Sequence, residues 1–222
     1  MALKKEDLPA FWKNYEASFK LGQPKSISDA TFVVFDTETT GFDLKNDRIL
    51  SIGALQLRNG EIKAKEAFEV FLKQSTFDAR TVEIHGILKK GPRNRISEIA
   101  GMEKLLHLLK NSVIVAHHVG FDVGMVNQAL RRNGLPKLMN PKLDTAILFN
   151  KSLPRTKRKT NGHYSLDALC EAFEIPKTDR HTALGDAYIT AIAFLQILEK
   201  LKPASLEQLL KKDRFWEFWK PA

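Results

Sequence analysis

Two acidic residues stand two positions apart at the end of an apolar segment. Residues 31–35 are a run of β-branched and aromatic residues that predicts a buried strand. Asp36 directly follows this run, and Glu38 comes two positions later. Residues two apart on a strand point to the same face, so we expect the two carboxylates to lie side by side at the strand's end. Like charges held close repel unless a cation neutralises them, and Mg²⁺ or Mn²⁺ prefers such hard oxygen ligands. The alternative is a polar turn over residues 39–41 that simply ends a strand.

Two later segments also place an acidic residue beside an apolar element. Residues 112–116 predict a second buried strand, and Asp122 follows at the start of a stretch with helical periodicity. Helix capping is the alternative role for Asp122, because a carboxylate also suits the positive end of a helix dipole. Asp186 lies in the first turns of an apolar helix expected over residues 188–198, and His181 precedes it in a loop. A capping or surface position is the alternative for His181.

The order and spacing of these segments resemble the signature of the DEDDh exonucleases. These enzymes are the relatives of the proofreading subunit of the bacterial replicative polymerase, ribonuclease T and oligoribonuclease. The resemblance covers roughly residues 31–201, and the matching positions are Asp36, Glu38, Asp122, His181 and Asp186.

Two shorter segments also look similar to the family, and one position departs from it. His85-Gly86-Ile87 matches a tripeptide that proofreading-type members carry near the substrate, and Asp144-Thr145 matches an Asp-Thr pair after a short strand. The family commonly has His-Asn before its second motif, where this chain has His117-His118. A polar contact made by the family's Asn is therefore in doubt at His118.

The resemblance implies a two-metal mechanism. Asp36, Glu38, Asp122 and Asp186 would hold two divalent cations, Mg²⁺ or Mn²⁺, which activate water and stabilise the leaving 3′-oxygen. His181 would take the proton of the attacking water. The candidates to hold the terminal nucleotide are Thr39, Thr40, His85, His118, Phe121 and Asp144.

The expected activity is 3′–5′ exonucleolytic release of nucleoside monophosphates from single-stranded or mismatched DNA 3′ ends, as in proofreading. The tripeptide at His85 favours DNA over RNA. One alternative is an exoribonuclease of the oligoribonuclease or ribonuclease T kind, because discrimination at a 2′-hydroxyl depends on pocket shape. A catalytically silent nucleic-acid-binding module is a third possibility, which the intact carboxylate set disfavours.

The order of predicted elements indicates an α/β fold. Strands over residues 48–57 and 62–71 flank an Asn59-Gly60 turn, which favours a tight hairpin. A helix over residues 99–109 and a short strand at 142–143 then alternate with the elements described above. Both the resemblance and this order predict a ribonuclease H-like mixed β-sheet flanked by helices on both faces.

Composition sets outer bounds on the kind of protein. A chain of 222 residues with 43% hydrophobic residues can bury a sizeable core, and its net charge of +9 fits a polyanionic partner such as nucleic acid. Many small basic proteins bind no nucleic acid, so the charge is support only. The single cysteine, Cys170, cannot form an internal disulfide and fits a buried site in a reducing cytoplasm. No stretch approaches the ~20 apolar residues of a membrane span, and the first residues lack a secretory signal, so we expect a cytoplasmic protein without membrane contact.

The chain divides into an N-terminal helical extension (1–30), the exonuclease domain (31–201) and a C-terminal helical tail (202–222). Both flanks carry aromatic stripes that either pack onto the domain or dock a partner, such as a DNA polymerase subunit or a second copy of the chain. The stripe residues are Leu8, Phe11, Trp12, Tyr15 and Phe19 in the first flank, and Leu206, Leu209, Leu210, Trp216 and Trp219 in the second.

A basic segment, residues 151–162, is punctuated by proline and glycine and predicts a mobile loop. It is either a solvated surface loop or an arm that contacts phosphates near the active site. Further cations that could extend such a surface are Arg93, Arg95, Arg131 and Arg132.

Overall fold

Six strands form one mixed sheet in the order β4-β3-β2-β1-β5-β6 in the computed structural model, which describes residues 3–76, 78–89 and 93–211. The strands β1, β2 and β3 pair antiparallel, whereas β5 is parallel to β1, β6 to β5 and β4 to β3. Their bounds are β1 Thr31–Thr39, β2 Ile49–Arg58, β3 Glu61–Leu72, β4 Arg95–Ile96, β5 Val113–Ala116 and β6 Lys142–Asp144. The predicted α/β fold with a mixed sheet is confirmed.

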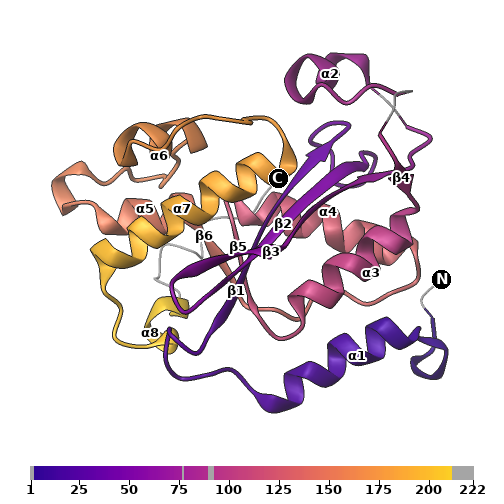
Figure 1. Cartoon of the computed structure of the whole chain (residues 1–222), viewed down its shortest axis with the longest axis horizontal. Coiled ribbons are helices and arrows are strands. Elements are labelled where there is room, and N and C mark those ends of the chain that lie inside the picture. Colours follow the sequence, from indigo (N-terminus) through magenta and orange to yellow (C-terminus); the bar gives the residue numbers. More distant parts are fainter. Residues whose placement is uncertain (1–2, 77, 90–92, 212–222) are drawn as a thin grey trace.

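Helices cover both faces of the sheet, as Figure 1 shows. Alternate residues of β1 separate the two cores, because neighbouring side chains on a strand point to opposite faces. Val33 and Phe35 pack with α1, α3 and α4, whereas Phe32 and Val34 pack with α5, α6, α7 and α8. The helices are α1 Ala10–Ser18, α2 Ala79–His85, α3 Glu98–Leu109, α4 Val119–Arg132, α5 Thr145–Ser152, α6 Leu166–Phe173, α7 Ala183–Leu201 and α8 Leu206–Leu210. Short 3₁₀ turns lie at Lys5–Asp7, Phe19–Leu21 and Arg155–Lys157.

Several element boundaries differ from the expected ones. The strand β1 continues through Thr39, so Asp36 and Glu38 lie within the strand and not beyond its end. Pairing with β2 keeps this polar stretch extended, as far as a register shift between Glu38 and Thr39. The helix α7 already begins at Ala183, after a Thr182 side chain that accepts a hydrogen bond from the Gly185 N–H as an N-cap. The two-residue strand β4 was not expected.

The N-terminal aromatic stripe is part of the core. Trp12 and Tyr15 are each only 1% exposed, and α1 packs against α3. The Tyr15 hydroxyl donates to Asn140 Oδ1 at 2.6 Å and accepts from the Met139 N–H at 2.8 Å. The interpretation of these two residues as a docking surface is therefore wrong, and packing onto the domain is right.

The C-terminal flank is described as far as Lys211. Leu206 and Leu209 on α8 are buried in the core beneath α7. Trp216 and Trp219 lie outside the described residues. None of the helices in the described part of the chain is long and apolar enough to cross a membrane.

Candidate active site

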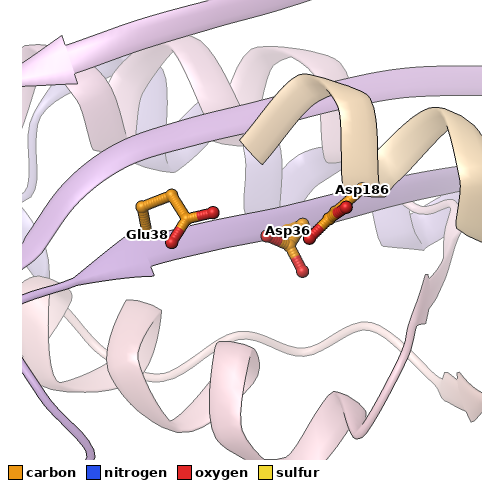
Figure 2. Close-up of side chains that lie close together, drawn as sticks. All are labelled: Asp36, Glu38 and Asp186. Carbon is orange, nitrogen blue, oxygen red and sulfur yellow. The ribbon is translucent and has the colours of Figure 1, made fainter. Parts of the chain in front are cut away.

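Three carboxylates from two elements meet beside the sheet. Asp36 and Glu38 lie two residues apart on β1 and face α7, while Asp186 projects from the first turn of that helix (Figure 2). One carboxylate oxygen of each residue lies within 4.8 Å of those of the other two. The prediction that Asp36 and Glu38 share a face is confirmed, and Asp186 joins them from a segment 150 residues further along the chain.

Asp122 approaches β1 from the opposite face. It lies in the first turn of α4 and is 3% exposed. Its Oδ1 accepts a hydrogen bond from the Thr37 N–H at 3.0 Å and from the Thr37 hydroxyl at 2.7 Å. Thr37 is the residue between Asp36 and Glu38, so its side chain points to the α4 face. Asp122 therefore lies outside the group of three, although its charge still acts on Asp36 and Glu38.

Burial raises the pKa values of all four acids, and repulsion from the other acids adds to the shifts of Asp36 and Glu38. The pKa of Glu38 is raised to about 8 by burial first and then by the charges of Asp186 and Asp122. Burial also raises the pKa of Asp122 to about 7, although the hydrogen bonds from Thr37 oppose this shift. The pKa values of Asp36 and Asp186 are raised as well, with burial as the first cause. Such a cluster is stabilised by a cation, because a positive charge favours the ionised form of every member.

The chemistry of this cluster fits a divalent cation. Asp186 Oδ1 is buried and has no hydrogen-bond partner within the described ranges, which is costly for a carboxylate oxygen unless a cation binds it. The other oxygen, Oδ2, accepts a hydrogen bond from Arg180 Nη1 at 2.5 Å. Asp36, Glu38 and Asp186 together supply the hard oxygen donors that Mg²⁺ and Mn²⁺ prefer.

His181 lies in the turn immediately before α7. Its backbone is in the left-handed region with φ 63°, and its side chain is exposed. The nearby backbone amide of His181 acts to lower the pKa of Asp186, against the larger raising effect of burial. The imidazole is therefore attached to the turn just before the helical turn that carries Asp186, and it is open to solvent.

The two threonines after Glu38 are engaged within their own turn. The Thr39 hydroxyl donates to the Gly41 carbonyl at 2.8 Å. The Thr40 hydroxyl donates to Asp47 Oδ1 at 2.6 Å, and Thr40 is only 2% exposed. These bonds give both hydroxyls a role in shaping the turn that follows β1.

Asp144 and His85 are also buried candidates. Asp144 caps α5 by accepting from the Ala146 N–H at 2.9 Å, and its other oxygen accepts from the Val119 N–H at 3.0 Å. It thereby links β6 to the start of α4. His85 ends α2 and is 6% exposed, and its Nδ1 accepts from the Ile87 N–H at 3.0 Å. The structure thus shows intramolecular partners for both side chains.

His118 occupies the N-cap position of α4 in the left-handed region, with φ 59°. Asn and His are both enriched in this backbone conformation, which explains why His can stand where the family commonly has Asn. Its ring lies 4.4 Å from the His117 ring and 5.4 Å from the His163 ring, centroid to centroid. Burial lowers the pKa of His118, while the charge of Asp144 opposes that shift.

Phe42 was not identified from the sequence. It follows the turn after β1, is 84% exposed, and lies against Phe121 with 5.6 Å between ring centroids. Phe121 directly precedes Asp122, so the aromatic pair lies at the first turn of α4, which carries that acid. A large apolar residue within the polar stretch Gly41-Phe42-Asp43 was the signal that could have revealed it.

The basic segment contains more regular secondary structure than expected. Its first residues end α5, and Arg155–Lys157 form a 3₁₀ turn. Arg158 donates to the carbonyls of Leu153 and Lys151, at 3.0 and 2.6 Å. The segment is therefore not a loop throughout, as was expected, because it includes the end of α5 and a 3₁₀ turn, and most of it is exposed. The two residues that follow the segment contact the histidines before α4. His117 Nε2 is 2.9 Å from the Tyr164 carbonyl, and the His163 ring lies beside the His118 ring.

Two of the arginines that could extend a phosphate-binding surface, Arg132 and Arg93, already have contacts within the protein. Arg132 forms an ion pair with Glu98 at 2.7 Å, and its side chain is 23% exposed. The Arg93 guanidinium lies 4.5 Å from the centroid of the Phe71 ring. These two residues thus have intramolecular partners.

A family model described as an exonuclease model of the RNase T type matches residues 33–194, which is most of this chain and includes all five predicted catalytic positions. The chain belongs to this exonuclease family. The resemblance to the DEDDh exonucleases is confirmed, and the class of enzyme is that of the 3′–5′ exonucleases, which are hydrolases.

Relatives of this exonuclease chain include much longer proteins. It is 33% identical over 193 residues to the PolC-type DNA polymerase III of Caldanaerobacter subterraneus subsp. tengcongensis, and 33% identical over 190 residues to that of Thermotoga petrophila. Each match covers 85% of this chain and 13% of the polymerase. The chain thus spans about one eighth of the length of these relatives.

Solved structures support the fold of the exonuclease. Exonuclease I of E. coli in complex with a dT13 oligonucleotide superposes with a TM-score of 0.68 at 20% identity, over 78% of this chain and 42% of that one. Cell-death related nuclease 4 superposes with a TM-score of 0.62 at 14% identity, over 80% and 66% of the two chains. The expected ribonuclease H-like arrangement is confirmed by these neighbours.

Proposed function

We propose that this chain hydrolyses the terminal phosphodiester bond at DNA 3′ ends with the help of two divalent cations, Mg²⁺ or Mn²⁺, and releases nucleoside monophosphates. The observation that carries the proposal is the convergence of the Asp36, Glu38 and Asp186 carboxylates, one of which, Asp186, has a buried Oδ1 without a hydrogen-bond partner in the described part of the chain. Asp122, which reaches β1 from the other face, completes the set of four acids. Divalent cations held by these residues supply Lewis acidity that activates water and offsets charge on the phosphate.

We assign proton transfer, base stacking and structural support to residues around the carboxylate cluster. His181 is exposed beside Asp186, and an imidazole in that position can accept the proton of the attacking water. Phe42 and Phe121 offer aromatic faces on which a terminal base can stack without its identity being read. Thr39, Thr40 and Asp144 support the site by holding the turn after β1 and the start of α4 in place.

DNA is the substrate that we propose, because the relatives are DNA polymerases and exonuclease I was solved with a DNA oligonucleotide. The net charge of +9 suits a polyanion. In the polymerase relatives the matched region is a small part of the whole, so we also propose that this chain edits 3′ ends for a DNA polymerase.

The test is a comparison of matched oligonucleotides labelled at the 5′ end. Single-stranded DNA, 3′-mismatched duplex DNA and single-stranded RNA of one sequence are incubated with the protein and Mn²⁺ or Mg²⁺. We expect stepwise shortening from the 3′ end and mononucleotide products, with DNA preferred. Preference for the RNA strand would overturn the choice of DNA. Cleavage that persists in EDTA would overturn the role of the cations.

A further inference from the structure

The guanidinium of Arg180 lies between two carboxylates that belong to different helices. Its Nη1 donates to Asp186 Oδ2 at 2.5 Å, and its Nε donates to Asp167 Oδ1 at 3.0 Å. Asp167 is in the first turn of α6 and Asp186 in the first turn of α7. The Arg180 side chain is 16% exposed and that of Asp186 is 9% exposed, so this contact is shielded from solvent, whereas the Asp167 side chain is 45% exposed.

This contact restrains the orientation of the Asp186 carboxylate. Because Oδ2 is held by Arg180, rotation of the carboxylate is restricted, and Oδ1 is buried with no hydrogen-bond partner among the residues that the structure describes. A planar guanidinium can bridge two carboxylates in a fixed geometry, whereas the ammonium of a lysine is a compact point charge on a flexible stem.

We propose that Arg180 is a positioning residue that orients Asp186 for cation binding, with Asp167 as its anchor. The inference rests on the proposed function, because it requires that the carboxylate cluster takes a divalent cation. Groups that orient metal ligands through hydrogen bonds change metal affinity by about 10–100-fold when they are removed.

Simple electrostatics predicts the opposite result. The positive charge of Arg180 lies next to Asp186 and repels a cation that binds there, so its removal alone would tighten cation binding. Replacement by lysine separates the two effects, because it keeps the charge and removes the planar fork. The direction of the change in affinity therefore decides between orientation and charge.

The experiment is calorimetric titration of the full chain with Mn²⁺ alone, without nucleic acid. We expect Arg180→Lys to bind Mn²⁺ about 10-fold more weakly than wild type, and Arg180→Gln about 10–100-fold more weakly. Lys177→Gln is the matched control, since Lys177 pairs with the same Asp167 at 3.7 Å and with Glu171 at 3.2 Å. Its Mn²⁺ affinity should equal that of wild type.

Folding is checked by circular dichroism and thermal unfolding in EDTA. If Arg180→Gln does not fold, Asp167→Asn replaces it, because that variant removes the anchor and leaves every acid of the cluster in place. Weaker Mn²⁺ binding by a folded Asp167→Asn supports the inference. Equal or tighter binding by the folded Arg180→Lys variant overturns it and leaves the proposed function intact. A folded wild-type protein that binds no Mn²⁺ overturns the metal-dependent function and this inference with it.

Discussion

Gly53 on β2 and Ala183 at the start of α7 touch backbone to backbone. A Cβ at Gly53 would lie 2.1 Å from the Ala183 carbonyl carbon, a distance that no side chain tolerates. Gly53 is also the antiparallel partner of Asp36 in the sheet. The missing side chain thus lets the first turn of α7 descend onto the sheet beside Asp36. This close approach is what carries Asp186 to the carboxylates of β1.

Replacing Asp36 with Asn should abolish hydrolysis and weaken Mn²⁺ binding. Asp36 is the acid on which the charges of Asp122, Asp186 and Glu38 all act, so its loss also relieves repulsion in the cluster. In EDTA the variant should therefore be more stable than wild type, by about 0.5–2 kcal/mol, the size of a typical single stabilising substitution. Urea unfolding with and without Mn²⁺ measures both effects. Wild-type turnover by the purified variant would refute the role of Asp36.

Replacing His181 with Ala should lower the rate of hydrolysis by about 10²–10⁴-fold, the usual contribution of a positioned general base. Mn²⁺ affinity should be retained, because the His181 imidazole is exposed and lies outside the carboxylate cluster. Single-turnover kinetics and calorimetry separate the two quantities. His107→Ala is the control, since His107 is an exposed histidine on α3. Near-normal turnover of His181→Ala would place the proton acceptor elsewhere.

Replacing Phe42 with Ala should weaken the binding of single-stranded DNA by about 1–3 kcal/mol, the usual value of one base stacked on an aromatic ring. The fold should be unaffected because Phe42 is 84% exposed. Fluorescence anisotropy with Ca²⁺ in place of the catalytic cation measures the affinity. Leu21→Ala, at a position that is 88% exposed, is the matched control. Equal affinity for wild type and Phe42→Ala would exclude stacking at this position.

Arg155 and Lys157 provide the test of the basic segment. Arg158 and Lys159 are engaged within the segment, where Lys159 donates to the His163 carbonyl at 3.2 Å, so their replacement would also disturb its structure. For single strands, log affinity falls with log salt with a slope of roughly −0.7 per neutralised phosphate. The double replacement of Arg155 and Lys157 by Ala should therefore make the measured slope shallower.

The control for this experiment removes the same amount of charge elsewhere. Lys4 and Lys5 are exposed near the N-terminus, and their replacement by Ala should leave the slope as in wild type. The rate of hydrolysis of an already bound 3′ end should be unchanged in both double variants. Parallel slopes for all three proteins would show that the basic segment is an ordinary solvated surface.

His117 should make the protein sensitive to acid. Its Nε2 faces the Tyr164 carbonyl at 2.9 Å and therefore carries the proton, while Nδ1 faces the Thr145 hydroxyl at 3.0 Å. Burial, and then the charge of His118, lowers the pKa of His117 to about 3. A depressed histidine pKa means that the stabilising contribution is complete above the unfolded value of about 6.5 and is lost as the pH falls towards 3.

The measurement is urea unfolding of wild type and His117→Gln at a series of pH values from about 7 to about 4. Between these limits the stability of wild type should fall relative to that of the variant by up to about 1.4 kcal/mol per pH unit, the value for uptake of one proton. Subtraction of the two curves cancels the carboxylates that both proteins share. His107→Gln, which removes an exposed histidine on α3, is the control variant.

The sequence by itself determined the local features of the site. The apolar run before Asp36 predicts a strand, and a spacing of two predicts that Asp36 and Glu38 share a face, as they do in β1. The helical periodicity after Asp122 predicts α4. These features follow from backbone geometry over a few residues, which repeats every two positions in a strand and about every 3.6 in a helix.

Only the tertiary structure decided which of the distant side chains meet. Thr37 holds Asp122 on the face opposite Asp186, Arg180 takes one oxygen of Asp186, and Phe42 lies on Phe121. The burial of Trp12 against the domain was likewise decided only by the tertiary structure. Each of these contacts except that of Arg180 joins segments far apart in the chain, so local periodicity carries no information about it. Such contacts depend on how helices pack on the sheet, and here a missing side chain at Gly53 sets how closely α7 approaches.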